Sequence, residues 1–305
     1  MMKIARSSLA FALFLAIYQN VFSQITSYKR NVLEIKIGVG GTTFFGDLGG
    51  SQGKGKDAFF DLDLATLGAN NSYGLKCNIN NRFAIRTDFG LARVSASDQY
   101  SEDENRRKRN LSFRSNIHEV SVTGEMVLVN MSQFTRNKRA TIEVYSFLGL
   151  GAIQFNPQAE LNGVWYDLQP LSTEGQGLEP GKSTYKLTSW VVPFGVGFRK
   201  DIGKRNYIGF ELSMRKTFTD YIDDVSTTYA DKTVLQSAKG DIAVQLSDRN
   251  LGEPYEGRVQ RGNPNNNDNY SFLQFTYSRS IGRKNASSGS LWQSLSPHKV
   301  RCPKF

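Results

Sequence analysis

Histidine, cysteine and long apolar runs are scarce in this chain of 305 residues, and each shortage argues against a class of protein. Two cysteines are too few for a small disulfide-built scaffold or for a metal site made of four thiolates. Two histidines argue against a histidine-rich metal site. After residue 23 no stretch has the roughly 20 apolar residues of a membrane-spanning helix, and the mean hydropathy of −0.41 excludes a bundle of such helices.

The first 23 residues have the pattern of a secretory signal peptide. Lys3 and Arg6 form a positive start, and a continuous apolar run follows over residues 9–17. This run is too short to cross a bilayer, although a single anchoring helix is the alternative interpretation. Val21 and Ser23 suit cleavage before the next residue, so we expect the mature chain to work outside the cytoplasm.

Bulky apolar residues alternate with small or polar ones along most of the chain, which is typical of β-strands. The clearest run has Trp190, Phe194 and Phe198 on one face, with Gly195 and Gly197 on the other. In a transmembrane barrel the apolar face meets lipid and the polar or small face lines the lumen. No helical domain is predicted. The pattern predicts eight strands, at 33–45, 72–80, 83–94, 111–128, 140–155, 185–199, 206–219 and 269–281.

Loop lengths distinguish a membrane barrel from a soluble sandwich, whose strands show the same alternation. The connections after the second, fourth and sixth strands are the shorter ones, and the others are long; the third long one spans residues 156–184. Outer-membrane barrels have an even number of strands, short periplasmic turns and long external loops. We therefore predict an all-β, eight-stranded antiparallel barrel that crosses the outer membrane of a Gram-negative bacterium. Its parts are a signal peptide (1–23), the barrel (24–281) and a periplasmic tail (282–305).

Basic residues gather on the segments that this topology places in the periplasm, where Asp201 is essentially the only opposing acid. A positive field of this kind steers an acidic partner towards the face that carries it. The alternative interpretation is that these turns are merely solvated and attracted to lipid head groups. The expected partner-binding basic face consists of Arg136, Lys138, Arg139, Lys204, Arg205, Arg283 and Lys284.

Few residues have the types and spacing that catalysis or metal binding needs. His118 and Glu119 lie together in mid-strand, and we expect His118 to be a lumen-facing polar residue rather than part of a catalytic triad. Asp220, Asp223 and Asp224 gather acids without the spacing of an EF-hand. The sequence therefore predicts no enzyme, no cofactor and no metal, and the export signal argues against nucleic acid as a partner.

The two cysteines fall on the same predicted side of the barrel. Cys77 lies near the periplasmic end of the second strand, and Cys302 lies in the tail. Disulfides persist in an oxidising compartment such as the periplasm. The pair therefore forms either a disulfide that ties the tail to the barrel or two independent thiols.

Several segments resemble one family of outer-membrane barrels. The most specific is 215–229, which reads Arg-Lys-Thr-Phe-Thr-Asp-Tyr-Ile-Asp-Asp-Val-Ser-Thr-Thr-Tyr. The others are 109–115, 156–159 followed by Trp165, 169–177, 193–197 and the ending Cys302-Pro303-Lys304-Phe305. Over roughly residues 33–305 the chain resembles the PorG-type barrels of the type IX secretion system, and the stretch 232–269 departs most from the family pattern.

The resemblance implies a non-enzymatic barrel that associates with the periplasmic ring of the secretion machine, a ring built from a lipoprotein and its partner. That machine exports proteins across the outer membrane and, in some bacteria, supports gliding motility. The resemblance makes the ring lipoprotein the candidate target of the basic face, and no small-molecule substrate is expected. Two alternatives stay open: a ligand-binding or transport barrel that uses its long loops, and a lipid-modifying enzyme that uses His118.

Overall fold

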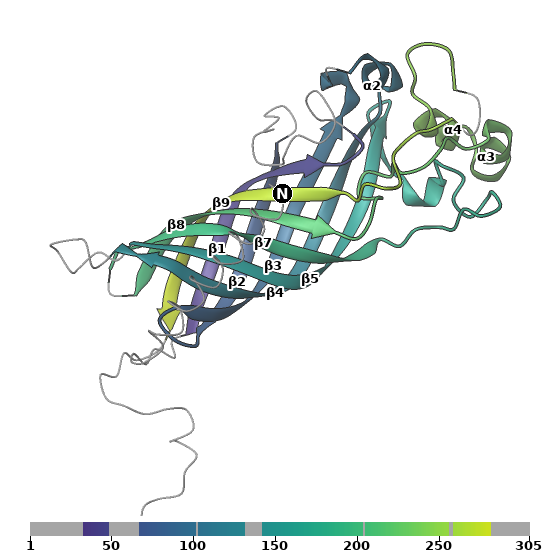
Figure 1. Ribbon diagram of the computed structural model, residues 1–305. Coiled ribbons are helices and arrows are strands. Elements are labelled where there is room, and N and C mark those ends of the chain that lie inside the picture. Colours follow the sequence, from purple (N-terminus) through teal and green to yellow (C-terminus); the bar gives the residue numbers. More distant parts are fainter. Residues whose placement is uncertain are drawn as a thin grey trace, which may run out of the picture.

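The protein is a closed β-barrel with a cap of loops and short helices at one end (Figure 1). The computed structural model describes residues 33–48, 67–101, 103–131, 142–203, 205–255 and 259–281. Nine strands form one antiparallel sheet in the order β4-β3-β2-β1-β9-β8-β7-β5-β6, and an additional pairing of β4 with β5 closes it. Because β6 is an appendage of β5 at the end of this order, the closed barrel has eight strands, as the sequence predicts.

The elements alternate between long strands and short helical pieces. The strands are β1 (Leu33–Phe45), β2 (Gly68–Asn78), β3 (Phe83–Ser97), β4 (Ser112–Asn130), β5 (Ile142–Leu161), β6 (Val164–Asp167), β7 (Thr188–Asp201), β8 (Asn206–Thr217) and β9 (Asn269–Ile281). The helices are α2 (Glu104–Arg109), α3 (Lys232–Lys239) and α4 (Asp241–Ser247), with 3-10 turns η2 (Asp98–Tyr100) and η4 (Gln169–Leu171).

The strand bounds agree with the predicted ones to within a few residues, except at the end of β5. There the chain continues to Leu161 and returns as β6 through Asn162 and Gly163, which both have positive φ, 53° and 79°. Asn-Gly is a strong signal for a two-residue hairpin turn. The prediction of one long loop over 156–184 is therefore wrong at its start, because it passed over this turn.

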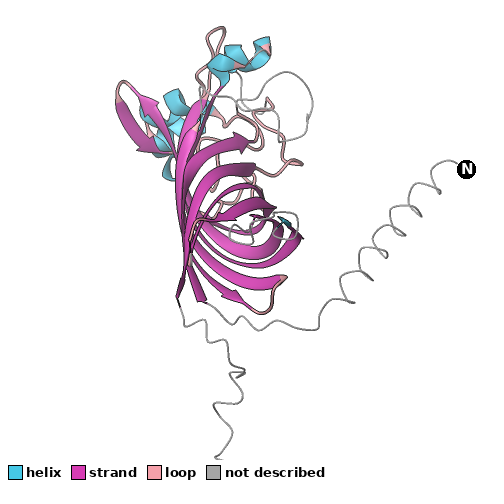
Figure 2. Cartoon of the chain, turned by 90° about the vertical axis from the view of Figure 1, so that its left-hand side faces the viewer, coloured by secondary structure: helices cyan, strands magenta, loops and turns pink. Residues whose placement is uncertain are grey.

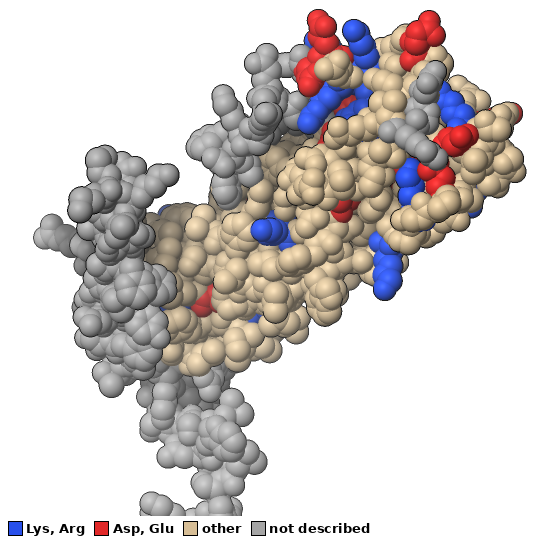
Figure 3. All heavy atoms as spheres, turned by 45° about the vertical axis from the view of Figure 1, so that its right-hand side comes forward, with Lys and Arg blue, Asp and Glu red and all other residues tan. Residues whose placement is uncertain are grey.

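The outer face of the barrel wall is apolar and the inner face carries polar residues, as contact with lipid requires. On β1 the outward Leu33, Ile35, Ile37 and Val39 are 43–48% exposed, whereas inward residues such as Lys36 are buried. A soluble sandwich would bury this apolar face, but here it surrounds the barrel. Figure 3 shows few charges on the visible wall and a concentration of them at the capped end. An apolar exterior around a polar interior is the arrangement of a transmembrane barrel.

The two ends of the barrel are unlike each other. At one end, here named the turn end, β7 and β8 are joined across residues 202–205 and β2 and β3 across 79–82. At the other, the loop end, long connections build the cap that holds α2, α3 and α4 (Figure 2). None of the helices in the described ranges has the length and apolar character to cross a membrane.

The helices of the cap are short, and local signals define them. Asp231 caps the start of α3 by accepting hydrogen bonds from the backbone amides of Thr233 and Val234, at 2.9 and 3.3 Å. Gly240, with a φ of 82°, ends it. Each of these helices is too short for the helical period to stand out along the chain, so they were not predicted.

An apolar core fills the lumen at the loop end. Phe44, Phe113, Ile117 and Phe155 point inward from the strands and are at most 9% exposed. The segment after β8 adds Ile222 and Val225 to the same cluster. The cap is therefore packed into the mouth of the barrel, and its position is fixed by burial.

Candidate functional site

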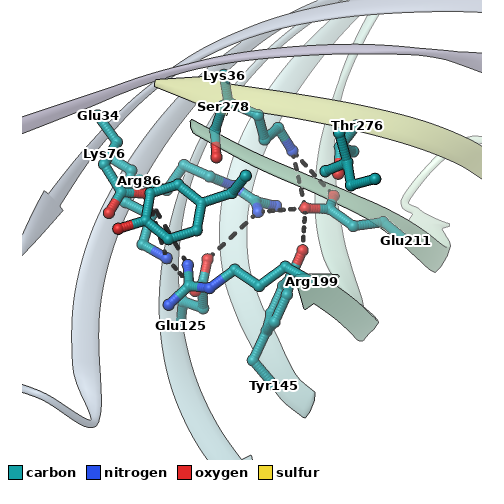
Figure 4. A pocket seen from close by; sticks show the side chains of 12 residues that line it. Glu34, Lys36, Lys76, Arg86, Glu125, Tyr145, Arg199, Glu211, Thr276 and Ser278 are labelled. Carbon is teal, nitrogen blue, oxygen red and sulfur yellow. Dashed lines mark hydrogen bonds and ion pairs between the residues drawn. The ribbon is translucent and has the colours of Figure 1, made fainter. Parts of the chain in front are cut away.

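A cluster of charged side chains fills the lumen towards the turn end (Figure 4). It draws its members from seven strands: Glu34 and Lys36 (β1), Lys76 (β2), Arg86 and Asp88 (β3), Glu125 (β4), Tyr145 (β5), Arg199 (β7) and Glu211 (β8). None of them is among the predicted site residues. A signal was present, because charges at alternate positions of otherwise apolar strands mark the lumen face.

Glu211 is the centre of one half of this lumen cluster. Its carboxylate accepts hydrogen bonds from the Lys36 ammonium at 2.9 and 3.1 Å, from the Arg86 guanidinium at 2.8 Å and from the Tyr145 hydroxyl at 2.7 Å. The side chain of Glu211 is 2% exposed. Charge-assisted bonds in such a dry setting are strong, and they balance the cost of burying the charge.

Glu125 is the centre of the other half. It pairs with Lys76, with Arg199 at 3.1 Å and with Arg86 at 3.5 Å, so Arg86 joins the two halves. Arg86 also bonds Asp88 at 2.6 Å. The cavity left within the cluster measures about 10 Å³, which is room for at most about a single water molecule. The lumen is thus filled at this level. The cluster links the strands across the lumen and leaves no path for solutes.

The segment 215–229 runs from the lumen into the cap and is largely buried. Arg215, on β8, bonds Glu119 at 3.2 Å, and Glu119 also accepts a hydrogen bond from Tyr270 at 2.9 Å. Further along, Asp224 is fully buried and accepts a hydrogen bond from the Tyr185 hydroxyl at 2.6 Å. Most of this segment therefore serves internal packing.

Two arginines with little exposed side chain, Arg261 at 2% and Arg109 at 12%, hold the cap together. Arg261 pairs with Glu174 at 3.2 Å, and Glu174 accepts hydrogen bonds from the backbone amides of Ser226 and Thr227, both at 2.9 Å. Arg109, the last residue of α2, bonds Asp98 at 2.7 and 2.9 Å and donates to the backbone carbonyl of Arg261 at 2.6 Å. Opposite charges raise the pKa of both guanidinium groups despite their burial, so both stay charged.

Four buried aspartates lie close together in the cap, and three of them bind backbone amides. Asp47, Asp223 and Asp268 accept hydrogen bonds from the amides of Asn263, Leu48 and Ile222, at 2.6, 3.2 and 2.8 Å. The fourth, Asp220, has no hydrogen bond of normal geometry to either carboxylate oxygen. Burial raises the pKa of Asp220 to about 7; Ser226 partly offsets this shift, and the negative Asp47 and Glu174 reinforce it. Burial also raises the pKa values of Asp223 and Asp268.

The structure does not test the predicted basic face. Arg205 is exposed in the turn between β7 and β8. The remaining members, Arg136, Lys138, Arg139, Lys204, Arg283 and Lys284, lie outside the described residues. The thiol pairing is untested for the same reason: Cys77 is exposed at the turn end of β2, and Cys302 is outside the described ranges.

The expectation that His118 faces the lumen is wrong. Along β4 the inward positions are odd-numbered, so Glu119 is buried and His118 is exposed on the outer wall, opposite Leu91 and Gln154 of the neighbouring strands. His118 and Glu119 therefore point to opposite faces and make no catalytic pair. Among the described residues, no three histidine, cysteine, aspartate or glutamate side chains are placed to hold a metal ion.

Replacement of Glu211 tests the lumen cluster. Glu211→Ala leaves Lys36 and Arg86 buried with an excess of positive charge, so we expect a loss of about 3–5 kcal/mol of unfolding free energy. The midpoint of urea unfolding in lipid vesicles measures it. The control is Glu253→Ala, an exposed glutamate of the cap, which should shift the midpoint little. Equal shifts for the two variants would contradict the role of Glu211.

The raised pKa of Asp220 predicts a pH-dependent cap. An unfolded aspartate titrates near pH 4, so between about pH 4 and pH 7 the folded cap holds a proton that the unfolded segment has lost. Stability from this group is therefore present at low pH and is lost as the pH rises towards 7. Asp220→Asn stays neutral, so its midpoint of thermal unfolding should rise relative to that of the wild type as the pH increases from 5 to 8. A difference between the two midpoints that stays constant across this range would contradict the assignment.

Comparisons with known proteins place the chain beside other barrels without giving it a role. Among curated proteins none matches the chain. The crystal structure of Neisserial surface protein A (NspA) is similar at 7% identity and a TM-score of 0.37, covering 82% of this chain and 97% of that one. The N-terminal barrel domain of OprF from Pseudomonas aeruginosa is similar at 7% identity and a TM-score of 0.35, covering 83% and 98%. Ail, the attachment invasion locus protein of Yersinia pestis, is similar at 10% identity and a TM-score of 0.35, covering 83% and 100%.

At such TM-scores these likenesses carry no argument about ligands or partners. A family model gives more, because the one described as Domain of unknown function (DUF6089) matches residues 11–241, well over half of the sequence. This span includes the strands from β1 to β8 and the segment 215–229. The chain belongs to the DUF6089 family.

Proposed function

We propose that the protein is a non-enzymatic anchor in the outer membrane that contacts the periplasmic lipoprotein ring of the type IX secretion system. The filled lumen supports the anchoring role. Arg86 joins Glu125 and Glu211 across the barrel, and the cavity left between them is about 10 Å³. An eight-stranded barrel with such a lumen holds a position in the membrane without offering a route through it.

In this proposal the turn end faces the periplasm and the loop end faces the exterior. The signal-like start of the sequence and the sorting of short turns from long loops support that orientation. Residues 136–139 and 204–205, and the chain beyond the end of β9, then carry their positive charge on the periplasmic side. An acidic surface on the ring would be attracted to this face.

The resemblance to the PorG-type barrels supports the link to type IX secretion. Its most specific segment, 215–229, is largely buried in the lumen and the cap, with Asp223, Asp224 and Val225 at most 1% exposed. A segment this buried preserves the fold and leaves little surface for a partner. Partner contacts in this proposal therefore lie at the turn end, where Arg205 is exposed.

Charge reversal tests the contact with the ring. Replacing Arg136, Lys138, Arg139, Lys204 and Arg205 by glutamate changes an attractive face into a repulsive one, so recovery of the ring lipoprotein should fall by at least about tenfold. The measurement is affinity purification of the tagged full chain in mild detergent, with mass spectrometry of bound proteins. Arg107→Glu, on the exposed side of α2 at the loop end, is the matched control and should recover the ring normally. Unchanged recovery with a folded five-residue variant would overturn the proposal.

Conductance tests the anchor against the alternative of a transport barrel. The filled lumen predicts no discrete current steps when the purified barrel is reconstituted in a planar bilayer. Barrel insertion is checked independently by its heat-dependent migration in gels. Reproducible steps from the inserted wild-type protein would favour a transport function instead.

A further inference from the structure

The outer wall of the barrel changes from apolar to polar before it reaches the loop end. On β3 the outward residues Phe89 and Leu91 are followed by the outward Arg93. On β4, read towards the same end, the outward Val120 is followed by polar residues that include Arg114. Phe89 and Val120 are 43% and 54% exposed and belong to the apolar band that lipid surrounds. The two arginines thus lie beyond the edge of this band, at the level where a bilayer presents its head groups.

The two arginines are diagonal neighbours on adjacent strands. Arg93 of β3 lies directly opposite Asn116 of β4, and Arg114 is the next outward residue of β4. Residues in this relation are about 7–8 Å apart, which is within reach of long side chains. Two guanidinium groups at these positions can therefore meet at one anion.

Contacts within the wall hold each guanidinium group by one nitrogen. Arg93 donates from Nε to the Asn116 side chain at 2.9 Å, and Arg114 donates from Nε to the Gln158 side chain at 3.0 Å. Arg114 also lies over the ring of Trp165, 3.5 Å from its centroid. Within the described ranges no hydrogen bond or ion pair involves the terminal nitrogens of either arginine. Since Arg93 is exposed and Arg114 half-buried, both groups are oriented and their terminal donors remain accessible.

The acids of this outer face lie away from the two arginines. Asp167 and Glu160 belong to the hairpin of β5 and β6, and Asp167 accepts hydrogen bonds from two amide side chains at 2.7 and 2.9 Å. Strand β5 separates Asp167 from Arg114, and two strands separate it from Arg93. In the described part of the chain no carboxylate forms an ion pair with either arginine. Their positive charges are therefore not neutralised within the fold.

A phosphate group on a lipid fits this pair of arginines. A guanidinium group binds phosphate through two parallel N–H···O bonds, and such charge-assisted bonds are strong. A soluble anion would gain nothing from the apolar band, whereas a lipid lays its acyl chains along Phe89 and Val120 while its phosphate meets the arginines. Trp165, which is 38% exposed beside Arg114, has the amphipathic ring that suits a membrane–water interface.

We propose that Arg93 and Arg114, here named the arginine pair, bind the phosphate group of a membrane lipid in the leaflet at the loop end. Asn116, Gln158 and Trp165 position the two guanidinium groups. In the orientation proposed above this leaflet is the outer one, so the ligand is a phosphorylated glycolipid such as lipid A. The arginine pair goes beyond the anchoring function, and loss of lipid binding would leave recovery of the ring unchanged.

The test counts the lipid that stays bound to the full chain. The protein is reconstituted in nanodiscs of phosphatidylcholine with added lipid A, and native mass spectrometry after release from the disc counts the lipid A molecules retained. Lipid A stripped of its phosphates should be retained at least about tenfold less than intact lipid A. Equal retention of the two lipids would overturn the proposal. Displacement of lipid A by millimolar inorganic phosphate would also overturn it, because the site would then take the anion without its lipid.

Variants tie the retained lipid to the arginine pair. The double variant Arg93→Gln with Arg114→Gln removes both guanidinium groups and should retain lipid A at least about tenfold less than the wild type. Arg279→Gln is the matched control, because Arg279 is an exposed outward arginine of β9 at the turn end, and it should retain lipid A normally. Wild-type retention by the double variant, or an equal loss in the control, would contradict the assignment.

A single variant guards against a folding effect, since Arg114 also stacks on Trp165. Arg93→Gln leaves that stacking intact and should lower the retention of lipid A at least about threefold. Arg93→Lys keeps the charge without the fork, so its retention should lie between those of Arg93→Gln and the wild type. Heat-dependent migration in gels checks that each barrel is folded. Normal retention by a folded Arg93→Gln barrel would overturn the proposal.

Discussion

The closed lumen of the barrel is narrow, and its width limits which side chains can point inward. Eight strands leave an interior just wide enough for side chains, so whatever points inward must pack and must be neutralised there. Glu211 meets this requirement by joining Lys36, Arg86 and Tyr145, which come from three other strands. Removing one charge would expose the others to a medium that cannot solvate them. The charges of the lumen are therefore a single unit rather than separate ion pairs.

The lumen changes character along its length, and the segment 215–229 connects the two parts. Towards the turn end the filling is ionic, whereas towards the loop end it is the apolar core of Phe44, Ile117 and Phe155. The segment begins with Arg215, which lies in the polar part of the lumen, and it continues to Ile222 and Val225, which lie in the apolar core. This segment therefore connects the barrel wall to the cap.

The alternation of residues was enough to predict the barrel, because a strand exposes its two faces to different surroundings wherever it lies. It gave the bounds of β1 and β9 and the sorting of turns from loops. Its failures are local. The hairpin at Asn162 and Gly163 was passed over, and His118 was assigned to the wrong face although a signal was present: Val120 and Val122 alternate with Ser121 and Thr123 and mark the even positions of β4 as outward.

The partners within the lumen could not be predicted in the same way. Lys36 and Glu211 are 175 positions apart, and alternation states only that both point inward. Which strands face each other across the lumen, and at what height, depends on the register of every strand between them. The contacts of the cap have the same difficulty, since α2 and the segment 260–263 meet only after the barrel has closed.

The ionic filling of the lumen also bears on how the barrel is assembled. Lys36 lies on β1 and Glu211 on β8, and β9 lies between these strands in the sheet. An open sheet in which β1 has not yet met β9 would present uncompensated charge to lipid, where such groups are poorly tolerated. Pairing of β1 with β9 therefore closes the barrel and neutralises the charges of its lumen in the same step. Insertion should proceed without stable half-formed intermediates in the bilayer, and the final seam should close together with the charge balance of the lumen.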